Sequence, residues 1–370
     1  ASKMQEKIDA FASENEWWLS DYAFFMAYRD HLNHKPIWEM EKSVKVKEKK
    51  AIQLYKELLA EEIGFYVFVQ YIFFEQWFQL KEYANGRGIE LIGDMPIYVS
   101  PNSADVWSNP KLFKVDEELK AKRIAGCPPD AYAKEGQLWG FPVYDWEYHE
   151  KTGYKWWISR IKHLLKMVDV LRIDHFRGFD RYWEVHQGEK NAINGKWFDG
   201  PKMRLFEAIS NQIPGARIIA EDLGKTDDGV RELLKETGYP GMKVMIFGLT
   251  EDNEHSPQNW PEHVIAYTST HDSEPIRAAI DSLSKEQYNR VAKSLKINKA
   301  ESIGMSVIKA AYDTKAETVI VPMPDVLSCS WEARINTPGK DGPENWSWRP
   351  KEMFSKTIAD KMASLVAIYK

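Results

Sequence analysis

Short apolar runs and longer amphipathic stretches alternate along most of the chain. Runs rich in Ile, Val and Leu that end in polar residues predict buried strands. Between them, apolar residues recur every three or four positions, which predicts helices. We expect strands at 90–97, 169–175, 217–222, 243–248, 264–270 and 318–323. We expect helices at 153–167, 204–211, 227–237, about 285–313 and 351–369. This alternation predicts an α/β fold whose parallel strands all end at one edge.

The residues before the first predicted strand carry a helical pattern. Residues 14–27 and about 47–84 place apolar side chains at helical spacing. We expect Gly64 to interrupt the second helix and Asn85-Gly86 to end it. The aromatic stripe of this helix is expected to lie in the core, and it comprises Phe65, Phe68, Tyr71, Phe74 and Trp77.

Two stretches, 100–146 and 180–203, show little regular pattern. Both contain many Gly, Pro and aromatic residues. Long loops of this kind are either functional or disordered, and the aromatic content favours ordered loops. We therefore expect these stretches to be ordered loops next to a functional site.

Four of the predicted strands end in a carboxylate, at Asp94, Asp174, Glu221 and Asp272. Since parallel strands end at one edge, we expect the four acids to converge there. Taken singly, Asp94 is as well explained by a helix cap or a turn, and Arg172 with Asp174 is better explained by a structural ion pair. Arg172 lies two residues before Asp174, so both side chains point to the same face of the strand. A carboxylate beside a guanidinium stays ionised near neutral pH, as a nucleophile requires.

A pair of carboxylates on either side of a glycosidic bond is the usual catalytic arrangement for glycoside cleavage. Asp174 is the expected ionised member of such a pair. Glu221 follows an apolar run and faces other acids, so we expect a raised pKa that suits a general acid/base. Asp272 is available to stabilise positive charge in the transition state. A divalent metal is the competing use of these acids, although metal sites favour close clusters or His pairs.

Composition narrows the classes of function. The chain has 370 residues, 44% of them hydrophobic, which fits a single large barrel domain. A net charge of −5 gives no electrostatic case for binding nucleic acid or an anionic membrane. Cys127 and Cys329 form neither a disulfide framework nor a metal motif. No apolar run approaches about 20 residues, so we expect a soluble, cytoplasmic protein. The 13% aromatic content fits a carbohydrate site, although large core residues explain most of it.

An ordered set of short motifs spans almost the whole chain. The motifs are Ile92-Gly-Asp-Met-Pro-Ile-Tyr-Val99, Ser103-Ala-Asp-Val-Trp107, Gly136-Gln-Leu-Trp-Gly140, Leu171-Arg-Ile-Asp-His-Phe-Arg-Gly178, Ala192-Ile-Asn-Gly195, Ile219-Ala-Glu-Asp-Leu-Gly224, Tyr239-Pro-Gly-Met-Lys243, Thr270-His-Asp272, Glu332-Ala-Arg-Ile-Asn-Thr-Pro-Gly339 and Asn345-Trp-Ser-Trp-Arg349. Through them the chain resembles the 4-α-glucanotransferases (amylomaltases) of the α-amylase clan. The resemblance implies a (β/α)₈ barrel that transfers α-1,4-glucan segments between maltooligosaccharides or starch- and glycogen-type glucans, with no cofactor and no metal.

The resemblance also assigns roles to individual residues. Asp174 would be the nucleophile that forms a covalent glucosyl-enzyme, Glu221 the acid/base and Asp272 the transition-state stabiliser. The implied substrate-binding residues are Asp94, Tyr98, Trp139, Arg172 and His271, of which Arg172 would orient Asp174 and His271 would bond sugar hydroxyls. The acceptor would be the 4-hydroxyl of another glucan, so water must be excluded while the intermediate waits.

The chain departs from the family pattern in the number of its strands. We count six predicted strands, whereas a closed barrel of this class has eight. We expect a single catalytic domain over 1–370, with a helical insertion region at 1–87, barrel strands three to eight with active-site loops at 88–350, and a final helix at 351–370. The first two strands of the barrel would then be absent from this chain.

Several loop residues also differ from the family pattern. Phe141 and Ser273 stand where the family has Asn, Ser269 and Lys202 where it has Gly, His186 where it has Pro, and Ser328-Cys-Ser-Trp331 where it has a Gly-rich turn. Glu274 is expected to add negative charge near Asp272 and to impair turnover. Two alternatives therefore stay open, an α-glucan hydrolase and a glucan-binding pseudoenzyme. A phosphate-handling barrel would lack its Gly-rich phosphate loop.

Overall fold

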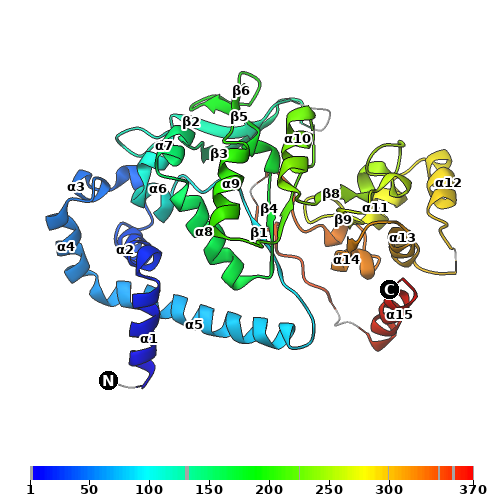
Figure 1. Cartoon of the computed structure of the whole chain (residues 1–370), viewed down its shortest axis with the longest axis horizontal. Helices are drawn as coiled ribbons and strands as arrows, with labels where there is room; N and C mark the ends of the chain where they lie inside the picture. Colours follow the sequence, from blue (N-terminus) through cyan, green and yellow to red (C-terminus); the bar gives the residue numbers. More distant parts are fainter. Residues whose placement is uncertain are drawn as a thin grey trace. The chain divides into compact units, whose positions relative to one another are not determined.

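The structure is a computed structural model, and it describes residues 3–129, 133–224, 226–298, 300–340, 342–351 and 355–369. Its contacts divide the chain into two compact units (Figure 1). The first unit comprises Ala1–Ile218 and Asp227–Thr237, and the second comprises Ile219–Thr226 and Gly238–Lys370. Within the irregular stretch predicted at 100–146, residues 130–132 lie outside the described part.

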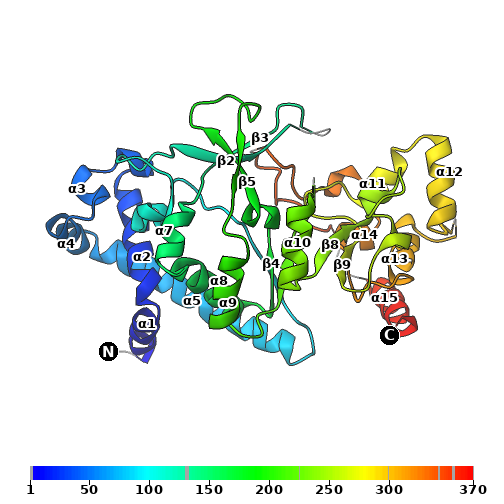
Figure 2. The same ribbon diagram turned by 45° about the horizontal axis from the view of Figure 1, so that its top comes forward.

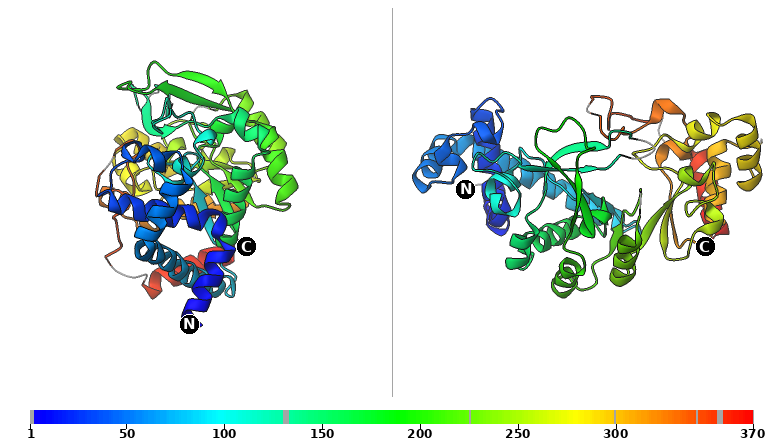
Figure 3. Two further views of the ribbon diagram at one scale, coloured as in Figure 1. Left: turned by 90° about the vertical axis from the view of Figure 1, so that its left-hand side faces the viewer. Right: turned by 90° about the horizontal axis from the view of Figure 1, so that it is seen from above.

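Helices make up the start of the first unit, as the pattern predicts. They are α1 (Lys3–Glu14), α2 (Glu16–His31), α3 (Lys42–Lys45), α4 (Lys49–Leu58) and α5 (Ala60–Asn85), with a 3₁₀ turn at Ile37–Glu39. The long α5, coloured light blue in Figure 3, packs against α1, α2 and α8. It ends at Gly86, as expected.

The expected break at Gly64 is wrong, because Gly64 lies inside α5 and the helix breaks at Leu59 instead. Leu59 leaves the helical conformation with its side chain buried, so core packing sets the break. A glycine inside a helix costs only about 1 kcal/mol, which α5 tolerates. The predicted aromatic core is correct for Tyr71 and Phe74, which are buried, and wrong for Phe65 and Phe68, which are exposed.

A three-stranded sheet with the order β1–β4–β7 carries the first part of the site. Its strands are β1 (Ile92–Met95), β4 (Val170–Ile173) and β7 (Ile218–Ala220). The strands β1 and β4 are parallel, and every residue of β4 is buried. The predicted helices appear as α8 (Lys155–Met167), α9 (Met203–Gln212) and α10 (Asp228–Thr237). The division between the two units falls inside β7.

The prediction of irregular loops at 100–146 and 180–203 is wrong, because both contribute to an antiparallel sheet (Figure 2). Its order is β3–β2–β5–β6, from β2 (Arg123–Cys127), β3 (Gln137–Pro142), β5 (Arg181–His186) and β6 (Lys196–Asp199). Short helices accompany it at α6 (Ala104–Ser108), α7 (Trp146–Lys151) and two 3₁₀ turns, Pro110–Leu112 and Phe176–Phe179. Strands this short show little alternation, and the pairing of β2 with β5 joins distant parts of the chain.

The second unit holds three parallel strands in the order β10–β9–β8. They are β8 (Gly241–Val244), β9 (Val264–Tyr267) and β10 (Thr318–Ile320). The helices are α11 (Ile276–Asp281), α12 (Lys285–Ser294), α13 (Ile303–Tyr312), α14 (Met323–Val326) and α15 (Lys356–Ile368), with 3₁₀ turns at Met245–Gly248, Pro257–Asn259 and Trp331–Ala333. The helices predicted over about 285–313 are α12 and α13, and Ser302 caps the start of α13.

The fold is therefore mixed α/β, and the six predicted strands all appear, in two sheets of three strands each. No helix within the described ranges combines the length and the apolar character that crossing a membrane requires.

Candidate active site

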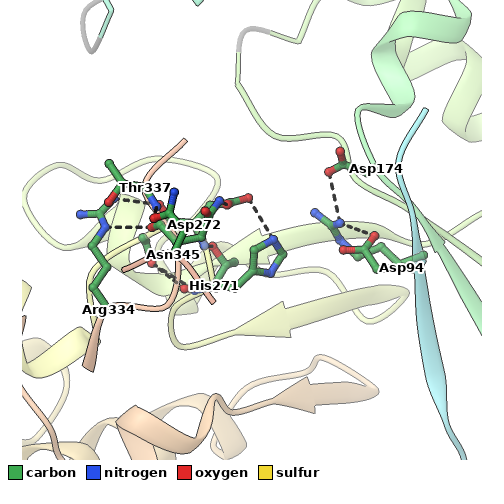
Figure 4. Close-up of polar contacts among 11 residues, drawn as sticks. Asp94, Asp174, His271, Asp272, Arg334, Thr337 and Asn345 are labelled. Carbon is green, nitrogen blue, oxygen red and sulfur yellow. Dashed lines mark hydrogen bonds and ion pairs between the residues drawn. The ribbon is translucent and has the colours of Figure 1, made fainter. Parts of the chain in front are cut away.

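A buried guanidinium holds two carboxylates together at the ends of β1 and β4. Asp94 and Arg172 are register partners on the two strands. The Arg172 Nη1 donates to Asp94 Oδ1 at 2.6 Å and to Asp174 Oδ1 at 3.2 Å (Figure 4). The Arg172 side chain is only 9% exposed, whereas those of Asp94 and Asp174 are 44% and 40% exposed. The predicted pairing of Arg172 with Asp174 thus exists, and the carboxylates remain accessible from solvent.

The chain turns sharply just after Asp174. The Asp174 N–H still donates to the Met95 carbonyl at 3.0 Å, and His175 then adopts a left-handed conformation with φ 53°. Gly178 makes this turn possible, because a Cβ there would lie 2.7 Å from Ile97 Cδ1 and 3.1 Å from His175 Cδ2. Burial, and secondarily the charge of Arg177, lowers the pKa of His175 to about 3, so this ring is neutral.

Aromatic side chains border this carboxylate pair within the first unit. The Trp139 ring lies perpendicular to the His175 ring with centroids 4.8 Å apart, and it lies 6.0 Å from the Tyr98 ring. Tyr98 is buried and stacks on Tyr144 at 5.8 Å. Burial raises the pKa of Tyr98 well above its usual range, which keeps its hydroxyl protonated. Trp139 is half-buried and is the more accessible of the two aromatic side chains among the predicted substrate-binding residues.

Two adjacent acids after β7 have different surroundings in the second unit. Glu221 is buried, and its Oε1 accepts the Leu223 N–H at 2.7 Å. Asp222 accepts the Met242 N–H at 2.6 Å at the start of β8 and lies 4.0 Å from Lys243 Nζ. Burial raises the pKa of Asp222. Asp222 therefore anchors the chain to β8, a role that sequence reasoning did not assign.

Both carboxylate oxygens of Asp272 have partners in the second unit (Figure 4). The Asn336 Nδ2 donates to Oδ1 at 2.7 Å, and His271 Nε2 lies 3.1 Å from Oδ2. The Arg334 Nη2 donates to the Asp272 backbone carbonyl at 3.0 Å. Arg334 and Asn336 therefore hold a residue that sequence reasoning singled out, although neither was assigned a role.

Residues 334–340, which carry Arg334 and Asn336, are hydrogen-bonded to residues 342–346 and to the His271 backbone. The Asn336 N–H donates to the His271 carbonyl at 2.9 Å, and the Thr337 N–H donates to Asn345 Oδ1 at 3.0 Å. The Trp346 ring lies 5.0 Å from the His271 ring. The only sequence signal for these contacts is the pair of motifs at 332–339 and 345–349.

Three of the residues that depart from the family pattern, Glu274, Ser273 and Lys202, have a well-defined local environment. Arg334 Nη1 lies 3.5 Å from Glu274 Oε2, so a cation balances the charge that Glu274 adds. The Ser273 Oγ accepts the Thr270 N–H at 3.1 Å and closes the turn that contains Asp272. Lys202 has φ 51° and ψ −145°, a conformation that favours glycine.

The structure thus brings together Asp94, Tyr98, Trp139, Arg172 and Asp174 in the first unit, and His271 with Asp272 in the second. Glu221 belongs to the second unit. Over the described ranges, no group of three or more His, Cys, Asp or Glu side chains is arranged to hold a metal ion.

Comparisons with known proteins agree over the whole chain. The profile of the family described as 4-alpha-glucanotransferase matches residues 1–354. A 4-alpha-glucanotransferase from Clostridium butyricum is 43% identical, and the alignment covers 100% of this chain and 76% of that protein. One from Aquifex aeolicus is 42% identical over 98% of this chain and 75% of its own. The solved structure of an amylomaltase from Streptococcus agalactiae in complex with acarbose is 39% identical, with a TM-score of 0.96 over 100% of this chain and 75% of that one.

Proposed function

The chain belongs to the 4-α-glucanotransferase family, and from this we propose that it transfers α-1,4-glucan segments through a covalent glucosyl-enzyme on Asp174. The observation that carries the proposal is the bond from the buried Arg172 guanidinium to the accessible Asp174 carboxylate.

The first half of the reaction breaks the donor glycoside. An Asp174 oxygen attacks C1 of the glucose unit at the scissile bond, and the bond from C1 to the leaving O4 breaks. Glu221 gives its proton to that O4, so the shortened glucan leaves with a free 4-hydroxyl. The product is a glucosyl ester of Asp174.

The second half reverses these roles. The Glu221 carboxylate takes the proton from the 4-hydroxyl of an acceptor glucan, whose oxygen attacks C1. The ester bond to Asp174 breaks and the carboxylate is restored. Two inversions at C1 retain the α configuration, so the transferred segment again carries an α-1,4 bond.

The contacts of Asp272 support its role as the stabiliser of the transition state. Asn336 and His271 each bond one of its carboxylate oxygens, which fixes the orientation of the negative charge. A fixed carboxylate stabilises the positive charge that develops on the sugar ring better than one that must reorient.

We infer that the substrates are maltooligosaccharides and longer α-1,4-glucans. The complex of the Streptococcus agalactiae relative with acarbose supports binding of an oligosaccharide. Asp94 and Trp139 are accessible enough to contact the glucan, His271 is placed beside Asp272, and Tyr98 backs the Trp139 ring. We also propose that the parallel strands belong to a (β/α)₈ barrel and that the chain acts as one catalytic domain.

Incubation with maltotriose tests the proposed reaction. Transfer of a maltosyl unit yields glucose and maltopentaose, and transfer of a glucosyl unit yields maltose and maltotetraose, whereas an α-glucan hydrolase yields only products shorter than maltotriose. A glucan-binding pseudoenzyme would bind maltotriose without converting it. Either of these two results would contradict the proposal.

The nucleophile is tested by Asp174→Asn, which we expect to lower kcat by more than about a thousandfold because an amide cannot form the ester. Asp228→Asn is the matched control, since Asp228 is a fully exposed carboxylate of the same unit. The control is expected to keep its activity. A transferase that survives Asp174→Asn would show that another residue is the nucleophile.

A further inference from the structure

One buried carboxylate in the second unit bonds both ends of the turn that carries Asp272. This turn, residues 268–276, connects β9 to α11 and contains His271 and Asp272. Asp325, on α14, is fully buried beside it. The proposed reaction gives Asp325 no role.

Three hydrogen bonds reach the Asp325 carboxylate. Its Oδ2 accepts the Thr268 hydroxyl at 2.5 Å and the Ser269 hydroxyl at 2.6 Å, both at the end of β9. Its Oδ1 accepts the Ile276 N–H at 2.8 Å, at the first residue of α11. The two oxygens of one side chain therefore connect the start of the turn to its end.

A carboxylate suits this position better than any neutral side chain. It is an acceptor only, so two hydroxyls and one amide can all donate to it. An asparagine has one acceptor oxygen, and its amino group would face hydroxyls that now act as donors. Burial raises the pKa of Asp325, and the three hydrogen bonds oppose that rise.

Asp325 is itself held firmly. A Cβ at Gly304 of α13 would collide with the Asp325 carbonyl, so the two helices pack backbone against backbone. The Gly304 N–H also donates to Ser328 Oγ at 3.3 Å. The backbone that carries the Asp325 carboxylate is thus held by close packing against α13.

We propose that Asp325 is a positioning residue that fixes the turn carrying His271 and Asp272 in the geometry that transfer requires. This inference rests on the proposed role of Asp272. Small displacements of a catalytic group lower kcat more than they change binding, because the group acts mainly in the transition state.

The test is Asp325→Asn, assayed on maltotriose at a temperature where circular dichroism shows the variant folded. We expect kcat to fall about ten- to hundredfold while KM changes less than about threefold. The double variant Thr268→Val with Ser269→Ala removes the same two bonds from the other side, and we expect a similar fall. Adding Thr268→Val to Asp325→Asn should lower kcat little further, since the two substitutions disrupt the same Thr268–Asp325 hydrogen bond.

Val307→Ala is the control for a general loss of stability. Val307 is fully buried in the core of the same unit and belongs to the cluster that contains Met245 and Ile276. We expect it to lower Tm and to leave kcat unchanged. A parallel fall of kcat in this control, or a kcat within twofold of wild type in folded Asp325→Asn, would overturn the inference. If Asp325→Asn does not fold, the double variant at Thr268 and Ser269 decides by the same criterion.

Asp272→Asn separates this inference from the proposed function. Loss of transfer in Asp272→Asn with normal kcat in Asp325→Asn would reject the positioning role alone. Full transfer activity in Asp272→Asn would reject the role of Asp272 itself, and the inference with it.

Discussion

At the scale of single residues, the most informative side chain is Arg172. Sequence alternation placed it on the same face as Asp174, but its bond to Asp94 depends on the register of β1 against β4, which no local pattern displays. One nitrogen, Nη1, serves both carboxylates. A lysine also carries its donors on one nitrogen, but its flexible stem and strongly hydrated ammonium would hold the two carboxylates less firmly than the planar guanidinium does.

We therefore expect Arg172→Lys to lower kcat for maltotriose disproportionation about tenfold or more. Arg217→Lys is the matched control, because Arg217 pairs with Glu90 in the same unit but is exposed. Exposed pairs contribute little, so the control should behave as wild type. Equal kinetics in the two variants would show that the guanidinium geometry is unimportant.

Lys202 illustrates a residue that does not suit its backbone. Its φ of 51° with ψ −145° belongs to a region that costs a non-glycine residue about 1–3 kcal/mol. We expect Lys202→Gly to raise Tm by a few degrees in a thermal unfolding scan. Lys202→Ala loses the same ion pairs with Asp180 and Asp199 without relieving the strain, so it should not raise Tm. A rise in both variants would point to charge rather than to backbone conformation.

At the scale of elements, the apolar pattern predicted where the strands lie but not where they end. The run at 243–248 predicts a strand, yet β8 spans Gly241–Val244 and a 3₁₀ turn follows at Met245–Gly248. Met245 and Ile246 pack into the core of the second unit although they lie in the 3₁₀ turn. An apolar run reports burial, and burial does not distinguish a strand from a turn of helix.

Residues 334–340 show that the site depends on irregular structure. Asn336 lies on neither a helix nor a strand, and its bond to Asp272 joins residues 64 positions apart. A motif indicates that the segment belongs to the family pattern, but it does not indicate which side chains the segment contacts. The partners of Asp272 therefore could not be predicted from the sequence.

We expect Asn336→Asp to lower kcat more than Asn336→Ala does. The aspartate would place a second negative charge within about 3 Å of the Asp272 carboxylate and favour its protonation, whereas alanine only removes a bond. Steady-state kinetics on maltotriose measures the difference. Asn259→Asp is the control, since Asn259 donates to Asp252 elsewhere in the same unit. A smaller effect of aspartate than of alanine would contradict this explanation.

At the scale of the whole molecule, the division into two units was not visible in the sequence. Domain boundaries are usually recognised from linkers, but here the boundary falls inside β7, and Asp227–Thr237 returns to the first unit. The proposed catalytic residues come from both units, with Asp174 in the first and Glu221 and Asp272 in the second. The rule that catalytic acids lie at strand ends predicts all three residues, and it uses no knowledge of the boundary.

Acid should destabilise the molecule through a buried histidine. His149 is fully buried, and burial lowers its pKa to about 4 from an ordinary value of 6.5. The unfolded chain therefore binds the proton first as the pH falls. The stability associated with neutral His149 is complete above pH 6.5, declines as the pH falls toward 4, and amounts to about 3 kcal/mol.

We expect His149→Gln to reduce the loss of Tm between pH 7 and pH 4.5, as measured by thermal unfolding. His263→Gln, at an exposed histidine, should retain the full loss. An unchanged pH dependence in His149→Gln would mean that other groups control acid unfolding.

The shared guanidinium of Arg172 has a consequence for the whole reaction cycle. In the proposed cycle, Asp174 loses its charge when it becomes an ester, and a largely buried guanidinium with that single partner would then lose its counter-charge. Asp94 prevents this, because it stays bonded to the same nitrogen at 2.6 Å. The net charge of Arg172, Asp94 and Asp174 would change from −1 to zero when the ester forms and return to −1 when it breaks. The guanidinium would therefore keep a counter-charge throughout the proposed cycle.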